Sequence, residues 1–200
     1  MPGNPTLFYH ETVPALTCVA TAVGITMAGF IAGQTASVSY QTTPALLEAP
    51  APVLVKQWKK LFDIGFKVAI PSYAICTAIF SWLASQEPRS SPAFKFYVAA
   101  ALLIPSNIPF TRIFVLPINN KLFEKDRSLA SVSLTDAAAE AGVSKEETVH
   151  ALVDKWATVN LGRVLITTTG ALCAAYAAIS KIDVRALSSV ALSGGADRLG

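Results

Sequence analysis

Residues 12–47 read "TVPALTCVATAVGITMAGFIAGQTASVSYQTTPALL" and contain no aspartate, glutamate, lysine or arginine. About 20 consecutive apolar residues are enough for a helix to cross the hydrocarbon core of a bilayer. The stretch exceeds that length, and no charge interrupts it. It therefore predicts a membrane-spanning helix, which we place at about residues 14–38.

The composition of the whole chain is that of a membrane protein. Hydrophobic residues make up 52% of the 200 residues and charged residues only 14%, whereas a soluble domain carries about 25% charged residues. Further apolar segments follow at about 64–85, 94–116 and 157–180. We therefore expect an all-α fold, a four-helix transmembrane bundle that forms a single membrane domain over residues 1–200. A soluble bundle with buried helices is the alternative.

The segments outside the spans differ in character. Residues 117–156 are expected to form an extended loop that includes the start of the last helix, because Ser144 followed by Glu147 is the pattern of a capping box. The tail, residues 184–200, is expected to be disordered. Lysines and arginines are concentrated in and beside the first and third connections. This distribution predicts that both connections face the cytosol and that both termini lie on the other side.

Charge, cysteine content and motifs exclude several classes of protein. The formal net charge is only +3 and no basic run is interleaved with aromatic residues, so nucleic acid is not an expected partner. The three cysteines are isolated within apolar segments, which does not fit a disulfide framework. The sequence has no glycine-rich phosphate loop, dinucleotide fingerprint, His-x-x-x-His pair or Cys-x-x-Cys, and His10 and His150 are too few for a histidine-rich metal site. We therefore expect neither a metal nor an organic cofactor. Two classes of protein remain: a non-catalytic membrane protein and an enzyme whose substrate supplies the reactivity.

One stripe of polar residues lies at the start of the last apolar segment. In "WATVNLGR", residues 156–163, the side chains of Trp156, Asn160 and Arg163 fall within about 60° of one another on a helix. An arginine at membrane depth costs about 2.5–3.5 kcal/mol on insertion scales and usually faces the interior of a bundle. The stripe is therefore a candidate pocket wall. The structural alternative is that Arg163 reaches the headgroups and that Asn160 bonds a neighbouring helix.

A second polar group lies in "PSNIPFTRIFVLPINNKL", residues 105–122. Its three prolines interrupt the third span, and Asn119 stands just after the last of them. Irregular backbone at membrane depth is tolerated where it is buried in protein or lines a cavity. The segment is therefore a candidate pocket edge, with an ordinary helix exit capped by asparagines as the alternative.

The first span carries small residues at a regular spacing. Gly29, Gly33 and Ser37 recur every four residues, a pattern that lets helices approach closely. They are expected to serve helix packing, and they are the candidate contact of a homo-oligomer. Tyr40 follows at the membrane interface expected for the two polar groups above and, with the adjacent Ser39, is a candidate to line the pocket.

The two polar groups together resemble a known family. "IPFTRIFVLPINNKL" resembles the pattern Pro-aromatic-Thr, a short apolar stretch and Pro-x-Asn-x-x-Leu, and "WATVNLGR" resembles Trp-x-x-x-Asn-x-x-Arg. In this order and membrane setting, the patterns resemble those of the anthrone oxygenases, small four-helix membrane proteins of fungal aromatic polyketide pathways. The resemblance extends over most of residues 20–180. By position it points to Pro109, Phe110, Thr111, Pro117, Asn119, Leu122, Trp156, Asn160 and Arg163.

The resemblance implies an enzyme that oxidises an anthrone, such as emodin anthrone, to the anthraquinone. Molecular oxygen would be the only co-substrate, with neither flavin nor metal. The anthrone methylene is acidified by its ketone and flanking rings, and its enolate is electron-rich enough to pass an electron to oxygen. The resemblance also implies an integral protein, surrounded by lipid, in the endoplasmic reticulum or another intracellular membrane.

The resemblance assigns hypothetical roles to the pocket residues. Asn160 and Arg163 are the catalytic candidates that stabilise the enolate oxygen, because preorganised donors in a dry site are often the largest catalytic contribution. Trp156 is expected to stack on the flat tricycle, and Asn119 to orient its phenolic hydroxyls. The further substrate-binding candidates are Phe110, Thr111 and Tyr40.

The general base is the least determined role. His150 has a suitable unperturbed pKa but lies off the stripe, and Asp63 lies at the mouth of the second span. We take His150 as the candidate, with a surface histidine as the alternative. Two other functions remain open for the whole chain: a non-catalytic scaffold with four spans and a small carrier of a secondary-metabolite pathway.

Overall fold

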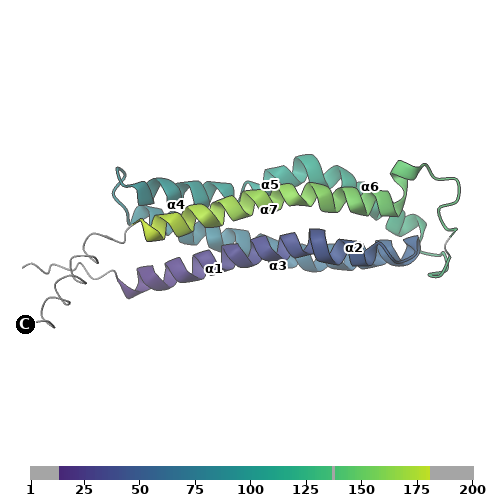
Figure 1. Cartoon of the computed structure of the whole chain (residues 1–200), viewed down its shortest axis with the longest axis horizontal. Coiled ribbons are helices and arrows are strands. Elements are labelled where there is room, and N and C mark those ends of the chain that lie inside the picture. Colours follow the sequence, from purple (N-terminus) through teal and green to yellow (C-terminus); the bar gives the residue numbers. More distant parts are fainter. Residues whose placement is uncertain (1–13, 137, 181–200) are drawn as a thin grey trace, which may run out of the picture.

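The computed structural model describes residues 14–136 and 138–180, and all regular structure in these ranges is helical. The elements form an elongated bundle (Figure 1). Their bounds are α1 Ala15–Ser37, η1 Val38–Thr42, α2 Thr43–Leu46, α3 Ala51–Ser85, α4 Pro92–Leu103, α5 Asn107–Phe110, η2 Thr111–Val115, α6 Leu116–Ser128, η3 Lys145–Glu147 and α7 Val149–Ile179. Segments η1 and η2 are π-helical turns, and η3 is a 3₁₀ turn.

Four rods make up the bundle. They are α1 to α2, α3, α4 to α6, and α7; the third is interrupted between α4 and α5, and each is long and apolar enough to cross a membrane. The start of α1 and the end of α7 lie at one end of the bundle, and the connection between α6 and α7 lies at the other, which we call the loop end (Figure 1). The predicted all-α fold with four candidate spans is confirmed. Which membrane holds the protein stays a prediction.

Helix α3 extends further than its hydropathy predicts. The second span was placed at 64–85, but α3 begins at Ala51, where Leu54, Val55 and Trp58 are fully buried against the rest of the bundle. The exposed Lys56 and Lys60 lower the hydropathy of this segment without interrupting its apolar face. Packing at the loop end therefore lengthens the helix beyond its membrane segment.

The connection before the last helix is shorter than the predicted loop at 117–156. Helix α6 continues to Ser128, and α7 begins at Val149. The capping box predicted at Ser144 is wrong, because Ser144 makes no capping bond and precedes only a 3₁₀ turn. The α7 cap is instead the hydroxyl of Thr148, which accepts from the Ala151 backbone N–H at 3.3 Å. The predicted tail at 184–200 lies outside the described residues.

The third rod is broken, as its prolines predict. Pro105 falls between α4 and α5, Pro109 lies within α5, and Pro117 opens α6. A proline supplies no backbone N–H and so interrupts the bonding of a helix. The π-helical turn η2 lies between Pro109 and Pro117, in the wider hydrogen-bonding pattern that often marks functional sites.

Two apolar cores hold the rods together. The first joins α1, α3, α4 and α7 around Phe80 and Tyr97, whose rings stack with centroids 6.4 Å apart. The second lies at the loop end around the fully buried Trp58, whose ring meets Trp156 edge-on at 6.1 Å and Phe123 at 5.2 Å.

Gly29 and Gly33, two of the regularly spaced small residues of α1, make no close contact with another helix among the described residues. A Cβ built on Gly29 or Gly33 has no neighbour within 4 Å, and Ser37 donates a hydrogen bond to Gln41 of the next turn. Gly24 is the close approach instead, since a Cβ there would lie 2.7 Å from the Phe80 ring. The expectation of packing within the chain is wrong for Gly29 and Gly33. A homo-oligomer through this stripe stays a prediction.

We expect Gly24→Ala to destabilise the bundle by about 1–3 kcal/mol, because the added methyl collides with a ring that is itself fully buried. Gly29→Ala is the matched control in the same helix and should cause no loss of stability, since its methyl enters open space. Thermal unfolding of both variants in the same detergent measures the difference. Equal stability of the two would contradict the close contact.

Candidate functional site

A cavity of about 550 Å³ lies between the two cores. Its wall takes residues from α1, η1, α3, the α5-to-α6 segment and α7, so every rod contributes. Ligand pockets commonly measure about 300–1,000 Å³ and are mostly apolar with a few polar groups. Both π-helical turns border the cavity, through Val38 of η1 and Thr111 of η2.

The Arg163 guanidinium is the centre of the polar wall. Its Nη1 donates to Asn160 Oδ1 at 2.9 Å, and its Nη2 donates to the Tyr73 hydroxyl at 3.0 Å. Asn160 in turn donates through Nδ2 to the Ser39 hydroxyl at 3.4 Å. Arg163 is thus fixed by groups from α3 and α7, with a further tie to η1. The alternative in which Arg163 merely reaches the headgroups is not what the structure contains.

Four buried polar atoms on residues that line the cavity have no hydrogen-bond partner among the described residues. Two are donors, Trp156 Nε1 and Arg163 Nε, and two are acceptors, Asn107 Oδ1 and Asn119 Oδ1. More than about 90% of buried polar groups in proteins are paired, so each such atom needs an explanation. All four belong to residues that line one cavity, so a polar ligand or water held there is the partner to consider for them.

Asn107 is a wall residue that the sequence did not single out. It is fully buried, and its Nδ2 donates to the Ile104 carbonyl and to the Thr167 hydroxyl, both at 3.0 Å. Thr167 donates back to the Arg163 carbonyl at 2.9 Å. The available signal was an asparagine between two prolines at membrane depth, the kind of polar residue expected to face a cavity.

Tyr73 is the second residue that sequence reasoning missed. Its side chain is almost fully buried, lines the cavity and receives the Arg163 bond. A tyrosine inside an apolar span also fits ordinary packing, so residue type alone did not distinguish it.

The predicted site residues divide into two sets. The first set lines the cavity together, as predicted for one pocket. It consists of Trp156, Asn160, Arg163, Asn119 and Thr111.

Phe110 and Tyr40 lie elsewhere. Phe110 does not line the cavity; its ring occupies the space beside Gly162, where no Cβ could fit, and contacts Phe114. Tyr40 is 61% exposed and also stands apart from the cavity, although the adjacent Ser39 bonds Asn160. Successive residues of a helical turn point in different directions, so Ser39 can bond Asn160 while Tyr40 points away from the cavity.

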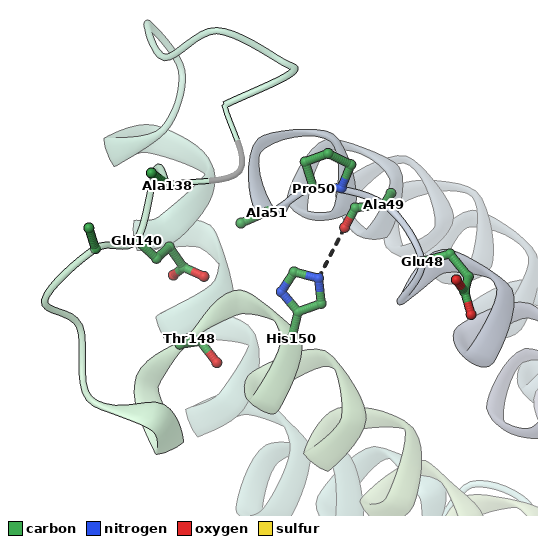
Figure 2. A pocket seen from close by; sticks show the side chains of 9 residues that line it. Glu48, Ala49, Pro50, Ala51, Ala138, Glu140, Thr148 and His150 are labelled. Carbon is green, nitrogen blue, oxygen red and sulfur yellow. Dashed lines mark hydrogen bonds between the residues drawn. The ribbon is translucent and has the colours of Figure 1, made fainter.

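His150, the predicted general base, is far from this wall. It lies at the loop end in a separate pocket bordered by Glu48, Pro50 and Glu140, where its Nε2 is 3.0 Å from the Ala49 carbonyl (Figure 2). This contact ties the first turn of α7 to the connection before α3, which is a structural role.

Asp63, the other base considered, does not border the cavity either. Its carboxylate pairs with Lys59 at 2.8 Å, and both side chains are nearly half exposed. The placement of His150 and Asp63 supports neither as the general base.

The electrostatic character of the cavity is positive. Among the described residues that line it, the ionisable groups are Tyr73, Arg112 and Arg163, with no carboxylate and no imidazole. Nowhere in residues 14–136 and 138–180 do three side chains of His, Cys, Asp or Glu come together as metal ligands. The arrangement favours an anion or a polarised oxygen over a cation.

Comparison with known proteins gives consistent matches. A family model described as "Anthrone oxygenase" matches residues 58–173. The chain is 31% identical over 155 residues to anthrone oxygenase nsrD of Aspergillus novofumigatus, covering 76% of this chain and 88% of the relative. It is 28% identical to anthrone oxygenase AgnL2 of Paecilomyces divaricatus over 78% of this chain and 93% of the relative. It is 32% identical to an anthrone oxygenase of Claviceps purpurea over 77% of this chain and 83% of the relative. No solved structure matches significantly.

We expect Thr167→Val to destabilise the protein by about 1–3 kcal/mol, because the Asn107 amide loses a buried acceptor while shape is nearly kept. Thr169→Val, an exposed site on the same helix, is the control and should be nearly neutral. Denaturant or thermal unfolding in detergent checks both. A Thr167→Val protein as stable as the control would refute the proposed support of Asn107.

Proposed function

Because the chain belongs to the anthrone oxygenase family, we propose that its cavity binds an anthrone-like polyketide and promotes its oxidation by molecular oxygen to the anthraquinone. The observation that carries the proposal is the cavity wall itself. A fixed guanidinium lines a largely apolar space, and four residues of the same wall carry an unpaired polar atom. A planar polycyclic phenol has the complementary surface, with apolar faces and oxygen atoms at its edges.

The chemistry starts with the acidity of the substrate. Loss of one proton from the anthrone methylene gives an enolate, whose negative charge rests largely on the ketone oxygen. The enolate passes one electron to oxygen, and the resulting carbon radical and superoxide combine, with a proton, into a hydroperoxide. Loss of water from the hydroperoxide leaves the new carbonyl, so one oxygen atom enters the product and the other leaves as water.

Arg163 is the proposed partner of the developing oxyanion. Its two Nη groups are engaged by Asn160 and Tyr73, which fixes the plane of the guanidinium before substrate arrives. Its buried Nε–H has no partner among the described residues and remains free to donate. Preorganised donors of this kind are often the largest single contribution to catalysis. Asn160 acts through Arg163 and is a positioning residue.

Tyr73 is the second proposed donor. Its hydroxyl oxygen accepts from Arg163, so its own hydrogen cannot point at the guanidinium. Because Tyr73 lines the cavity, that hydrogen is available to a substrate oxygen. Tyr73 and Arg163 together resemble an oxyanion hole in which one group orients the other.

The remaining polar atoms suit the phenolic edge of the tricycle. Asn119 Oδ1 and Asn107 Oδ1 are acceptors that hydroxyl groups could satisfy, and Trp156 Nε1 is a donor for a second carbonyl. This modifies the stacking role expected for Trp156, because its ring is already held edge-on against Trp58.

Proton removal does not require a strong base at this wall. The described lining contains no carboxylate or imidazole, so we propose that water takes the proton while the oxyanion donors lower the cost of forming the enolate. His150 has no part in this scheme. Independence from metal and organic cofactors is likewise proposed, on the ground that the enolate itself can reduce oxygen.

We expect the purified protein in lipid nanodiscs to convert emodin anthrone to emodin under air faster than empty nanodiscs do. Under ¹⁸O₂, one labelled atom should enter the quinone, as measured by mass spectrometry. Chelator treatment and removal of flavin should leave the rate unchanged. No acceleration over empty nanodiscs would refute the enzyme, as a scaffold or carrier requires, and restoration of activity only by added metal or flavin would refute cofactor independence.

We expect Arg163→Lys and Tyr73→Phe each to lower turnover by about 10²- to 10³-fold, the loss typical of one oxyanion donor, and Asn160→Ala to lower it by releasing the Arg163 guanidinium. Lysine keeps the charge of Arg163 but loses the planar fork that bonds Asn160 and Tyr73. The controls are His150→Ala at the loop end and Tyr176→Phe, which is exposed on α7, and both should stay near wild type. Normal turnover in Arg163→Lys and Tyr73→Phe, at equal protein abundance, would contradict the proposed oxyanion site.

A further inference from the structure

We propose that the cavity opens sideways into the bilayer, through a window between α3 and the broken third rod, and takes its ligand from the membrane. The ligand class is a planar aromatic phenol dissolved at the boundary between headgroups and acyl chains. The identity of this ligand as a substrate rests on the proposed function. The window itself is inferred from packing and exposure.

The contacts between α3 and the third rod leave the window open. Helix α3 packs against α4 on one side of the break and against α6 on the other. The α5 and η2 segments between them pack instead on α7 and make no comparable contact with α3. The prolines that break the third rod thus also separate it from α3 at the depth of the cavity.

The rim consists of apolar side chains that belong to both the cavity and the outer surface. Phe66 and Ile70 of α3 are 58% and 40% exposed, and Ile108 and Leu116 across the window are 44% and 39% exposed. All four also line the cavity. A side chain that borders an internal space and remains exposed marks a mouth of that space.

The rim residues lie on facing sides. Phe66 stacks on Phe62 at 6.1 Å, and Phe62 meets Phe123 of α6 edge-on at 5.2 Å, which places Phe66 on the side of α3 that faces the third rod. Ile108, Arg112 and Leu116 follow one another at intervals of four residues and all line the cavity, so they share one face.

Routes along the axis of the bundle are closed by the two cores. Towards the loop end, Trp58, Leu122 and Val153 are fully buried in the second core. Towards the other end, Phe80 and Ile104 are fully buried in the first core. The lateral window is therefore less obstructed than either route along the axis.

The chemistry of the rim fits the boundary region of a bilayer. The exposed cations Lys67 and Arg112 lie beside the apolar rim residues, and basic side chains on membrane helices extend to the headgroups. Aromatic groups with one polar edge concentrate at this depth. A polycyclic phenol would be enriched at the mouth, with Arg112, which lines the cavity, as the first cation it meets.

The experiment narrows the window with tryptophan. Ile70→Trp and Ile108→Trp are compared with Leu165→Trp, which is 70% exposed on α7 and does not line the cavity. Each variant is placed in nanodiscs, and the association rate of emodin is followed through its visible absorption. We expect both rim variants to bind about tenfold more slowly than Leu165→Trp, within the range over which association rates vary among variants of one site.

Turnover of emodin anthrone is the second measurement. We expect kcat/KM to fall by the same factor, with kcat nearly unchanged at saturation, because a narrowed mouth slows access and not chemistry. Phe66→Ala, which widens the mouth, should not slow association. Ile70→Phe and Ile108→Phe replace any tryptophan variant that fails to fold.

Two results would overturn the window. One is association in the rim variants as fast as in Leu165→Trp; the other is an equal fall in kcat and kcat/KM, which would mean that the substitutions disturb the bound state. The binding measurement needs no catalysis. A wild-type protein that binds emodin without oxidising its anthrone would refute the proposed function, while the rim variants would still test the window.

Discussion

An arginine placed inside a membrane bundle must have its donors satisfied, and most of the cavity wall follows from that constraint. The desolvation of a guanidinium is costly unless hydrogen bonds replace water. Asn160 and Tyr73 supply two of these bonds, and Ser39 and Thr167 hold the surrounding backbone and side chains in place. One donor nitrogen, Nε, has no partner among the described residues. Rigidity at the wall and an unpaired donor on a residue of that wall thus have the same origin.

Hydropathy predicted the four rods but not their full extent. Uncharged runs are a strong signal because lipid leaves a backbone few alternatives to a helix. The first turns of α3 carry that signal weakly, since Lys56 and Lys60 alternate with the buried Leu54 and Trp58. The sequence predicted the wrong first residue for the last helix, because both Ser144 and Thr148 fit a helix cap. The choice of Thr148 over Ser144 coincides with a distant contact, in which the Glu140 carboxylate accepts from the Val149 backbone N–H at 2.9 Å.

The candidate site was predictable only where its residues share one helix. Trp156, Asn160 and Arg163 lie on one stripe of α7, and periodicity alone brings them together. Tyr73 is 90 residues from Arg163 in sequence, so no local pattern connects the two. His150 shows the opposite error, since its chemistry suited a base but its place in the fold is the loop end. Residue type suggests a role, and tertiary structure decides whether the residue can reach it.

The length of α3 divides the bundle between two solvents. Its 35 residues span about 52 Å, whereas the hydrocarbon core of a bilayer is about 30 Å thick. The lysines of its first turns lie at the loop end, so the excess length emerges there. The core around Trp58 is consequently held by the hydrophobic effect, as in a water-soluble domain. The core around Phe80 lies within the four candidate spans, where a bilayer would leave it dependent on close packing, because lipid is as apolar as the side chains. Denaturants would therefore act on the second core, around Trp58, and detergents on the first, around Phe80, although one continuous helix carries both.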